Sequence, residues 1–172
     1  MKEPAQSYDR NTYKVIKKEQ TNNPIKHLVK THEGLYTFCK KYVYLNNKKV
    51  AKFTGKITQI INQSDLLICA DKNGSIKVIN KRVIKRFELG KEIKSLCSIN
   101  DKIFVVDNES TFYVFSLFEN DFIFKKSFKN ILSLQCDDNK VILCTKKELI
   151  FLNEEFKKIK SFKMKNKKNK LF

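Results

Sequence analysis

The chain has 172 residues with a formal net charge of +18, and 41% of its residues are hydrophobic. These values are sufficient for one folded domain and exclude a wholly disordered chain, and no apolar stretch approaches the roughly 20 residues that a membrane-spanning helix needs. Charge of this size favours a polyanionic partner such as RNA. The alternative is a solvated lysine surface shaped by nucleotide bias.

The N-terminal segment, residues 1–23, is polar and shows no clear periodicity, and Pro24 separates it from the first apolar segment. It predicts an extended arm that becomes ordered against a partner. Tyr8, Tyr13 and Ile16 are its candidate partner-anchoring residues.

Four segments of similar pattern follow, at 25–53, 57–87, 93–128 and 131–162. Each begins with two aliphatic residues three positions apart, continues with an apolar run and a turn, and ends on a phenylalanine. Self-similarity with a period of tens of residues is typical of propellers and solenoids. No helical periodicity competes with this pattern, so the sequence predicts an all-β fold in which each segment is a four-stranded meander.

The second segment shows the predicted strands most clearly. Leu66–Ala70 is an apolar run suited to a buried strand, and Asp71–Gly74 is a turn that uses the tolerance of Asn and Gly for positive φ. Ser75–Ile79 alternates polar and apolar residues, as a half-buried strand does. A turn at Asn80–Arg82 leads to an outer strand at Val83–Leu89.

The C-terminal segment, residues 163–172, is rich in lysine and nearly free of acidic residues, so it cannot build a core. It either contacts phosphates or serves as a nuclear import signal, and the alternative is an inert chain end. Its candidate nucleic-acid-binding residues are Lys163, Lys165, Lys167, Lys168 and Lys170.

The stretch Leu67–Asn80 resembles a WD40 blade, because a strand that ends in small residues is followed by an Asp-x-x-Gly turn and then by alternating residues. Asn80 stands where the family has the Asp of its Trp-Asp pair, and Ile79 stands in place of the Trp. The chain has no Gly-His pair and no Trp, so the polar network that those residues build in the family is absent. The resemblance implies four WD40-like blades within 24–162, forming a partial or small β-propeller.

Four blades are fewer than the number that is usual in WD40 rings. An open arc would leave two apolar blade faces exposed, which soluble monomers avoid. Three arrangements remain: a small closed four-bladed ring, a ring completed by a partner chain, and a reduced protein held inside a large complex. The last two are favoured, with other propeller or helical subunits as partners.

The N-terminal stretch Tyr8–Tyr13, with Ile16–Glu19 after it, is similar to the entry segment of a WD40 family of the small-subunit processome, that of U3 small nucleolar RNA-associated protein 15. Asp9 replaces the Trp of that family, and Val50–Phe53 is similar to the end of its first blade. The later blades and the C-terminal helical domain of the family have no counterpart here. The resemblance implies a scaffold in pre-ribosomal RNA assembly, in the nucleolus.

The cysteines and histidines do not predict a metal site. No pair of cysteines has Cys-x-x-Cys spacing, and His27 and His32 are the only histidines. The sequence therefore predicts no metal and no cofactor. The cysteines are expected to be reduced, buried residues of an intracellular protein; they are Cys39, Cys69, Cys97, Cys136 and Cys144.

No catalytic constellation is recognisable, since the chain has neither a Gly-rich phosphate loop nor a Ser-His-Asp spacing. His32 beside Glu33 is interpreted as a surface pair, and Asp137 beside Asp138 as a solvated hairpin tip. The sequence therefore predicts that the protein is not an enzyme, with no catalytic residue and no small-molecule substrate.

Basic clusters are the remaining functional candidates. Arg82 and Arg86 are the strongest, because a guanidinium group matches phosphate oxygens, and strand alternation places Lys85 and Arg86 on opposite faces. The further nucleic-acid-binding candidates are Lys81, Lys85, Lys125, Lys126, Lys146 and Lys147. The alternative is that these lysines only keep edge strands soluble and unpaired.

The predicted function is that of a non-catalytic scaffold subunit of a large ribonucleoprotein assembly. The favoured setting is pre-rRNA processing and small ribosomal subunit biogenesis in the nucleus and nucleolus, with pre-rRNA as partner and no membrane partner. The alternatives are a WD40-like protein–protein adaptor of a non-ribosomal complex and a factor bound to mature ribosomes, for which the cytoplasm is the alternative location.

Overall fold

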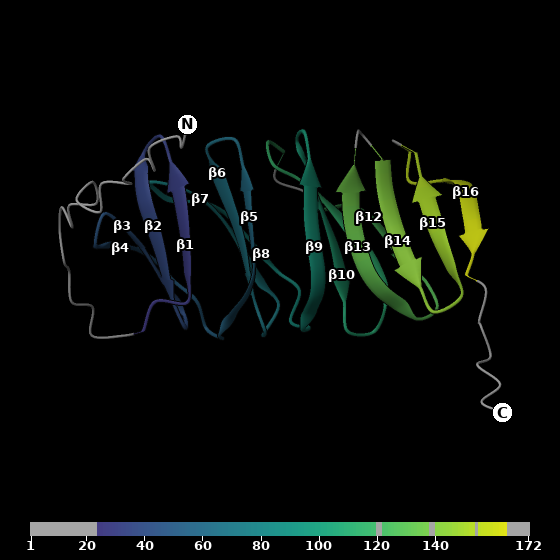
Figure 1. The fold of residues 1–172 in the computed structure, drawn as a ribbon, viewed down its shortest axis with the longest axis horizontal. Helices are drawn as coiled ribbons and strands as arrows, with labels where there is room; N and C mark the ends of the chain where they lie inside the picture. Colours follow the sequence, from purple (N-terminus) through teal and green to yellow (C-terminus); the bar gives the residue numbers. More distant parts are fainter. Residues whose placement is uncertain (1–23, 120–121, 138–139, 154, 165–172) are drawn as a thin grey trace, which may run out of the picture.

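Residues 24–119, 122–137, 140–153 and 155–164 are described by a computed structural model. Over these ranges the chain forms four antiparallel sheets, each with four strands in sequence order (Figure 1). We call the sheets blades one to four. A helix long and apolar enough to cross a membrane is not found within these ranges.

The sixteen strands of the described ranges fall into four consecutive groups. Blade one consists of β1 (His27–Thr31), β2 (Gly34–Cys39), β3 (Tyr42–Leu45) and β4 (Lys48–Lys52). Blade two consists of β5 (Ile57–Gln63), β6 (Leu66–Asp71), β7 (Ser75–Asn80) and β8 (Arg82–Glu88). Blade three consists of β9 (Ile93–Ile99), β10 (Lys102–Asp107), β11 (Thr111–Ser116) and β12 (Phe122–Ser127). Blade four consists of β13 (Ile131–Asp137), β14 (Lys140–Thr145), β15 (Glu148–Leu152) and β16 (Lys158–Lys163).

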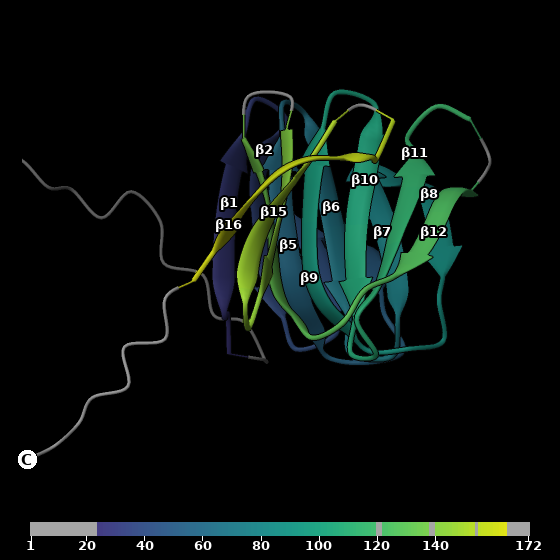
Figure 2. The same cartoon turned by 90° about the vertical axis from the view of Figure 1, so that its right-hand side faces the viewer.

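The blades pack face to face in chain order, and blades one and four lie at opposite ends of an open arc (Figures 1 and 2). The first strands of blades two, three and four contact one another in turn, which places β5 beside β9 and β9 beside β13. The prediction of an all-β partial propeller with four-stranded blades is confirmed. A closed four-bladed ring, one of the three arrangements considered, is wrong because the end blades do not face each other.

Each junction between neighbouring blades is an apolar core made by the facing sides of two sheets. In β6, Leu67 and Cys69 pack toward blade one, whereas Ile68 and Ala70 pack toward blade three. Blade two is therefore apolar on both faces, which explains why this strand is a continuous apolar run. Burying one large apolar side chain stabilises the fold by roughly 1.5–3 kcal/mol, so blade stacking is the main source of stability.

A buried carboxylate closes the turn after the second strand of blade two. Asp71 Oδ1 accepts hydrogen bonds from the backbone N–H groups of Asn73 and Ser75, both at 2.9 Å. Asp71 Oδ2 accepts from the N–H of Gly55 at 2.7 Å and from the hydroxyl of Thr54 at 3.0 Å. The carboxylate therefore shapes its own turn and also holds the segment that enters the blade.

The same arrangement recurs in the next two blades with substitutions. Asp107 Oδ1 accepts from the N–H groups of Glu109 at 2.9 Å and Thr111 at 2.8 Å, and its Oδ2 accepts from the Tyr113 hydroxyl at 2.9 Å. Burial, with Asp107 nearby, raises the pKa of Tyr113 and keeps this donor protonated. In blade four Thr145 takes the place of the Asp, and its hydroxyl accepts from two N–H groups of its turn. These turns supply polar bonds in blades that lack the Gly-His pair and the Trp.

Two cysteines form a disulfide between blades three and four. Cys97 of β9 and Cys136 of β13 are joined, with their Cα atoms 5.9 Å apart. The expectation that all cysteines are reduced is therefore wrong at these positions, because the packing of β9 against β13 brings together residues separated by 39 positions. Cys69 is a free thiol buried between blades one and two.

Replacing Asp71 with Ala removes the acceptor of four hydrogen bonds. Two come from N–H groups of its own turn, and two come from the hydroxyl of Thr54 and the N–H of Gly55. We expect the free energy of unfolding to fall by about 3 kcal/mol, because a buried donor left unpaired costs roughly 1–3 kcal/mol. Urea denaturation followed by circular dichroism measures the change.

The matched control is Asp101→Ala, which makes the same chemical change in a partly exposed turn. The Asp101 carboxylate has a distant ion-pair partner, the ammonium of Lys102 at 4.0 Å. We expect this variant to lose less than about 1 kcal/mol. Equal losses in the two variants would show that the buried carboxylate contributes no more than a surface one.

Candidate nucleic-acid interface

The outermost strand of every blade is cationic. Among β4, β8, β12 and β16, all of them described in full, Glu88 is the single acidic residue. The first strands of the blades differ, since they carry only Lys30 and Lys94 as ammonium groups. We call the following residues the cationic belt: Lys48, Lys49, Lys52, Arg82, Lys85, Arg86, Lys125, Lys126, Lys158, Lys160 and Lys163.

The position of the belt follows from the way in which the blades stack. The outermost strand of a blade is a sheet edge, paired with another strand on one side only. Charged residues at such an edge are solvated and also prevent pairing with other strands. All residues of the belt except Lys85 are exposed. The belt therefore presents its charge at the outer edges of four successive blades.

A buried lysine and an exposed arginine lie side by side where blades one and two meet. Lys77 of β7 is 8% exposed, and its ammonium donates to the backbone carbonyl of Lys52 and lies 4.7 Å from the ring centroid of Phe53. Arg86 is directly opposite Lys77 in the ladder between β7 and β8. Burial lowers the pKa of Lys77, and the positive charge of Arg86 lowers it further. A bound anion would relieve this repulsion between neighbouring cations.

Arg82 and Arg86 form no salt bridge with any carboxylate among the described residues. Some other cations are paired: the Lys81 ammonium lies 2.6 Å from Glu33, and the Lys158 ammonium 3.0 Å from Glu148. Hydrogen bonding to Lys81 holds the pKa of Glu33 below its ordinary value. The two guanidinium groups are therefore exposed cations that a phosphate can approach from solvent.

The other predicted nucleic-acid-binding residues lie in several different places. Lys125, Lys126 and Lys163 lie on outermost strands. Lys85 points toward blade three, where its ammonium donates to the carbonyl of Ser116 at 2.9 Å and to that of Glu119. Lys146 and Lys147 lie in the turn between β14 and β15 instead of on an outermost strand. The remaining candidates fall outside the described residues, so their roles stay predictions; they are Tyr8, Tyr13, Ile16, Lys165, Lys167, Lys168 and Lys170.

Several cations of the belt were not among the sequence-based candidates. Lys48, Lys49 and Lys52 occupy β4, and Lys160 lies in β16. The signal that could have found Lys52 and Lys160 is their place one or two residues before the phenylalanine that closes a repeat, where Lys85 and Arg86 stand in the second repeat.

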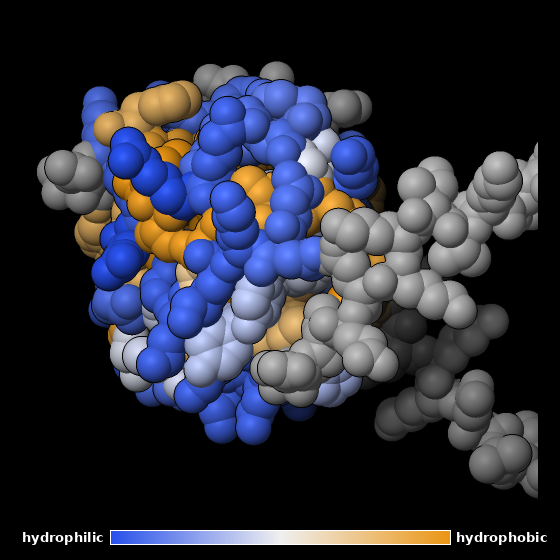
Figure 3. Space-filling view, turned by 90° about the vertical axis from the view of Figure 1, so that its left-hand side faces the viewer, coloured by the Kyte–Doolittle hydropathy of each residue, from blue (hydrophilic) through white to orange (hydrophobic). Residues whose placement is uncertain are grey.

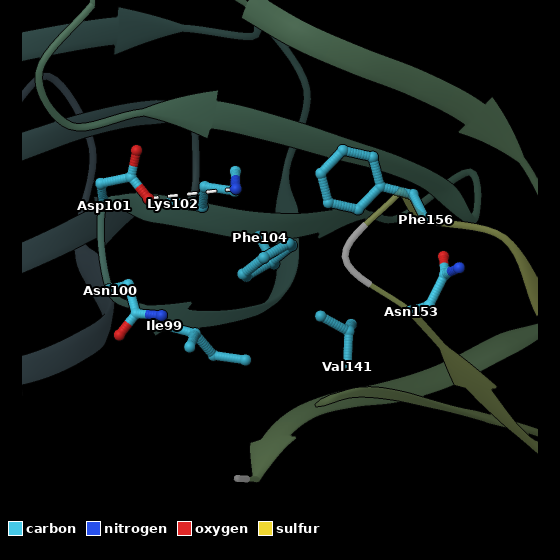
Figure 4. A pocket seen from close by; sticks show the side chains of 8 residues that line it. All are labelled: Ile99, Asn100, Asp101, Lys102, Phe104, Val141, Asn153 and Phe156. Carbon is cyan, nitrogen blue, oxygen red and sulfur yellow. Dashed lines mark ion pairs between the residues drawn. The ribbon is translucent and has the colours of Figure 1, made fainter. Parts of the chain in front are cut away.

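A small pocket of about 120 Å³ opens between blades three and four (Figure 4). Its apolar wall includes Phe104 and Phe156, whose ring centroids are 6.0 Å apart, and its rim includes Asp101, Lys102 and Asn153. The volume is below the roughly 300–1,000 Å³ of small-molecule sites, so it suits one apolar side chain of a partner better than a substrate. No group of His, Cys, Asp or Glu within the described ranges is placed to hold a metal.

No protein-family model and no curated protein matches the sequence. Solved structures do match: BamB from Moraxella catarrhalis has a TM-score of 0.64 and 12% identity over 80% of this chain and 47% of its own. The WD40 β-propeller domain of Doa1 has a TM-score of 0.60 and 13% identity over 80% of this chain and 52% of its own. The fold is a partial β-propeller of the WD40 kind.

The extent of the match differs between these structures. The chain spans about half the length of BamB and of the Doa1 domain. The computationally designed Ika4 protein, with a TM-score of 0.59 and 13% identity, is matched over 86% of this chain and 95% of its own. The described blades therefore correspond to part of a larger ring in the first two cases and to nearly a whole chain in the third.

Replacing Lys77 with Met keeps an unbranched side chain over Phe53 and removes the charge. The pKa of Lys77 is below its ordinary 10.5 in the folded protein, so the unfolded chain binds more protons just below that pH. The stability of the wild type should therefore rise with pH as 10.5 is approached, and that of the variant should lack this contribution. Urea denaturation at several pH values measures the difference between the two proteins, and a difference independent of pH would contradict the expectation.

Proposed function

We propose that the protein is a non-catalytic scaffold that binds RNA along the cationic belt. The distribution of charge carries this proposal. The outermost strands of all four blades bear two or three Lys or Arg residues each, against the single carboxylate of Glu88. A stripe of exposed cations on one side of a domain is the electrostatic feature expected of a surface that follows a phosphate backbone.

Aromatic rings beside the belt help to orient several of its ammonium groups. The ammonium of Lys49 lies 5.7 Å from the ring centroid of Tyr42, and that of Lys125 lies 5.5 Å from that of Tyr113. Also in blade three, the ammonium of Lys126 lies 5.4 Å from the ring centroid of Phe128. A lysine that rests on a ring has fewer rotamers to lose when it meets a phosphate. Binding of this kind depends on charge and shape and is independent of base sequence.

The first test is fluorescence anisotropy with a labelled single-stranded RNA of about 20 nucleotides, titrated with the full chain at several salt concentrations. The double variant Arg82→Glu, Arg86→Glu reverses the two exposed guanidinium charges. We expect it to weaken binding at least about tenfold, and each lost phosphate contact to reduce the slope of log K against log salt by about 0.7.

The matched control is the double variant Lys56→Glu, Lys72→Glu. It makes the same change in net charge, and both lysines are exposed but lie outside the outermost strands, before β5 and after β6. We expect a loss of less than about threefold, from long-range charge alone. Equal losses in the two double variants, or no RNA binding by the wild type, would overturn the belt as an RNA surface.

The setting that we propose for this scaffold is pre-rRNA processing and small ribosomal subunit biogenesis in the nucleolus. The similarity of Tyr8–Tyr13 and the first blade to a processome WD40 family supports it, together with the net charge of +18. The test is affinity purification of the tagged chain from native cells at moderate salt, with both RNA and protein identified. Enrichment of pre-rRNA with U3 RNA is expected; a single non-ribosomal complex without enriched RNA would overturn this setting.

A protein–protein adaptor is the second candidate, and a specific surface favours it. Ile84 of β8 and Phe122 and Ile123 of β12 are exposed, and Phe118, in the loop before β12, is 79% exposed. Exposed apolar side chains on two neighbouring blades offer contacts to a partner protein. The two candidates differ in the purification described above, because ribonuclease treatment would release partners held through RNA and would leave directly bound proteins in place.

A further inference from the structure

The two ends of the arc each present a blade face that no other described blade covers. In blade four this face is apolar on its two central strands, whereas Ser133 and Gln135 of β13 and Lys160 of β16 share the same side of the sheet. Ile142, Cys144, Leu149 and Phe151 are partly exposed on it, and Phe162 is 47% exposed. In a propeller such a face is normally the next junction, because each blade there is covered on both sides.

The comparison with blade three shows what is missing. The positions in blade three that correspond to Ile142 and Phe151 are Phe104 and Val114, as the pairing of the second and third strands shows. Both are buried in the core against blade four. Blade four therefore carries the side chains of a junction core without a following blade.

The outward face of blade one is the opposite half of such a junction. Leu35, Thr37 and Tyr44 lie on it. Leu35 and Thr37 are two residues apart in β2 and so point to the same side of the sheet, and Tyr44 is the partner of Thr37 in the ladder between β2 and β3. Leu28, which pairs with Thr37, is 61% exposed, and Leu35 is 40% exposed. Figure 3 shows apolar side chains exposed between hydrophilic ones at this end of the molecule.

We infer that a second copy of this chain covers both faces, with blade four of each copy stacked on blade one of the other. In every junction within the chain, the side of a blade that faces the C-terminal end of the arc packs on the side of the next blade that faces the N-terminal end. Each chain has one unused face of each type, so two copies satisfy one another and leave none exposed. Each of the two junctions joins unlike faces, and a two-fold axis relates the junctions to each other. The interface as a whole is therefore isologous, and the ring closes after two copies.

The lengths of the similar solved structures agree with this count. The chain corresponds to 47% of BamB and 52% of the Doa1 domain, so two copies supply about one complete propeller. The Ika4 chain, of which 95% is matched, is a solved protein of similar extent. A second copy therefore accounts for the half-ring with no subunit other than the chain itself.

A lysine that reaches from one blade to the next within the chain indicates a similar contact at the proposed junction between copies. Lys85 of blade two reaches the carbonyl of Ser116 at the end of the third strand of blade three. Lys160 of β16 occupies the position that corresponds to Lys85. Lys160 is paired with Phe151 in blade four, and Lys85 is paired with Val78 in blade two. In the dimer, Lys160 is therefore placed to donate to a carbonyl at the end of β3 in the second copy.

The inference does not rest on RNA binding, and its test is the mass of the RNA-free full chain by light scattering after gel filtration. The expected mass is about twice the 20.3 kDa of the chain. Phe151→Asp places a charge on the blade-four face, and Tyr44→Asp places one on the blade-one face. Each variant alone loses both junctions of the dimer and is expected to be monomeric.

A mixture of the two variants distinguishes this arrangement from a dimer in which like faces pair. One junction then joins two intact faces, so a dimer of the two variants is expected to reappear. Ile123→Asp is the control, because Ile123 is an exposed apolar residue on an outermost strand away from both faces, and it should stay dimeric. Circular dichroism checks that each variant keeps its strands.

Three results would overturn the inference. The first is a monomeric wild type. The second is a dimer that Tyr44→Asp leaves intact while Phe151→Asp breaks it, because blade four would then pair with its own copy. The third is a mixture of the two variants that stays monomeric although both are folded.

Discussion

A β-sheet that is apolar on both faces must be covered on both faces, and this constraint governs the molecule. Blades two and three satisfy it within the chain, through three junction cores whose side chains come from neighbouring sheets. Stacking of this kind buries apolar residues between the sheets, whereas the charged residues of the outermost strands remain in water at the outer edges. The cationic outer strands and the uncovered end faces are two results of the same arrangement.

Buried carboxylates supply what apolar stacking cannot, namely fixed positions for the turns. Asp71 and Asp107 are fully buried yet have hydrogen-bond donors around them, mostly backbone N–H groups. Because those donors belong to the turn itself, the carboxylate fixes where the third strand begins. The bonds from Thr54 and Gly55 extend this effect to the connection between blades one and two. The chain thereby keeps blade geometry without the polar pairs that are usual in the WD40 family.

Sequence patterns predict the strands and their grouping well, because alternation and turn residues are local properties. Asp71 is recognisable as a turn residue, but its burial depends on Thr54 and Gly55, which approach it only in the folded chain. The disulfide between Cys97 and Cys136 is hidden for the same reason. Arg82 and Arg86 are predictable from charge, whereas Lys85 is engaged between blades because of the neighbouring loop, which no local pattern contains.

The meander order of the strands has a consequence for folding. Each strand pairs with its neighbour in sequence, and each blade packs on the next one along the chain, so no closure over a long loop is needed inside the arc. Such a chain behaves as a linear array whose cooperativity passes from neighbour to neighbour. Within a single chain, blades two and three are held from both sides and blades one and four from one side. In the monomeric state, amide hydrogens in β1–β4 therefore exchange with solvent through openings that leave the centre of the array intact.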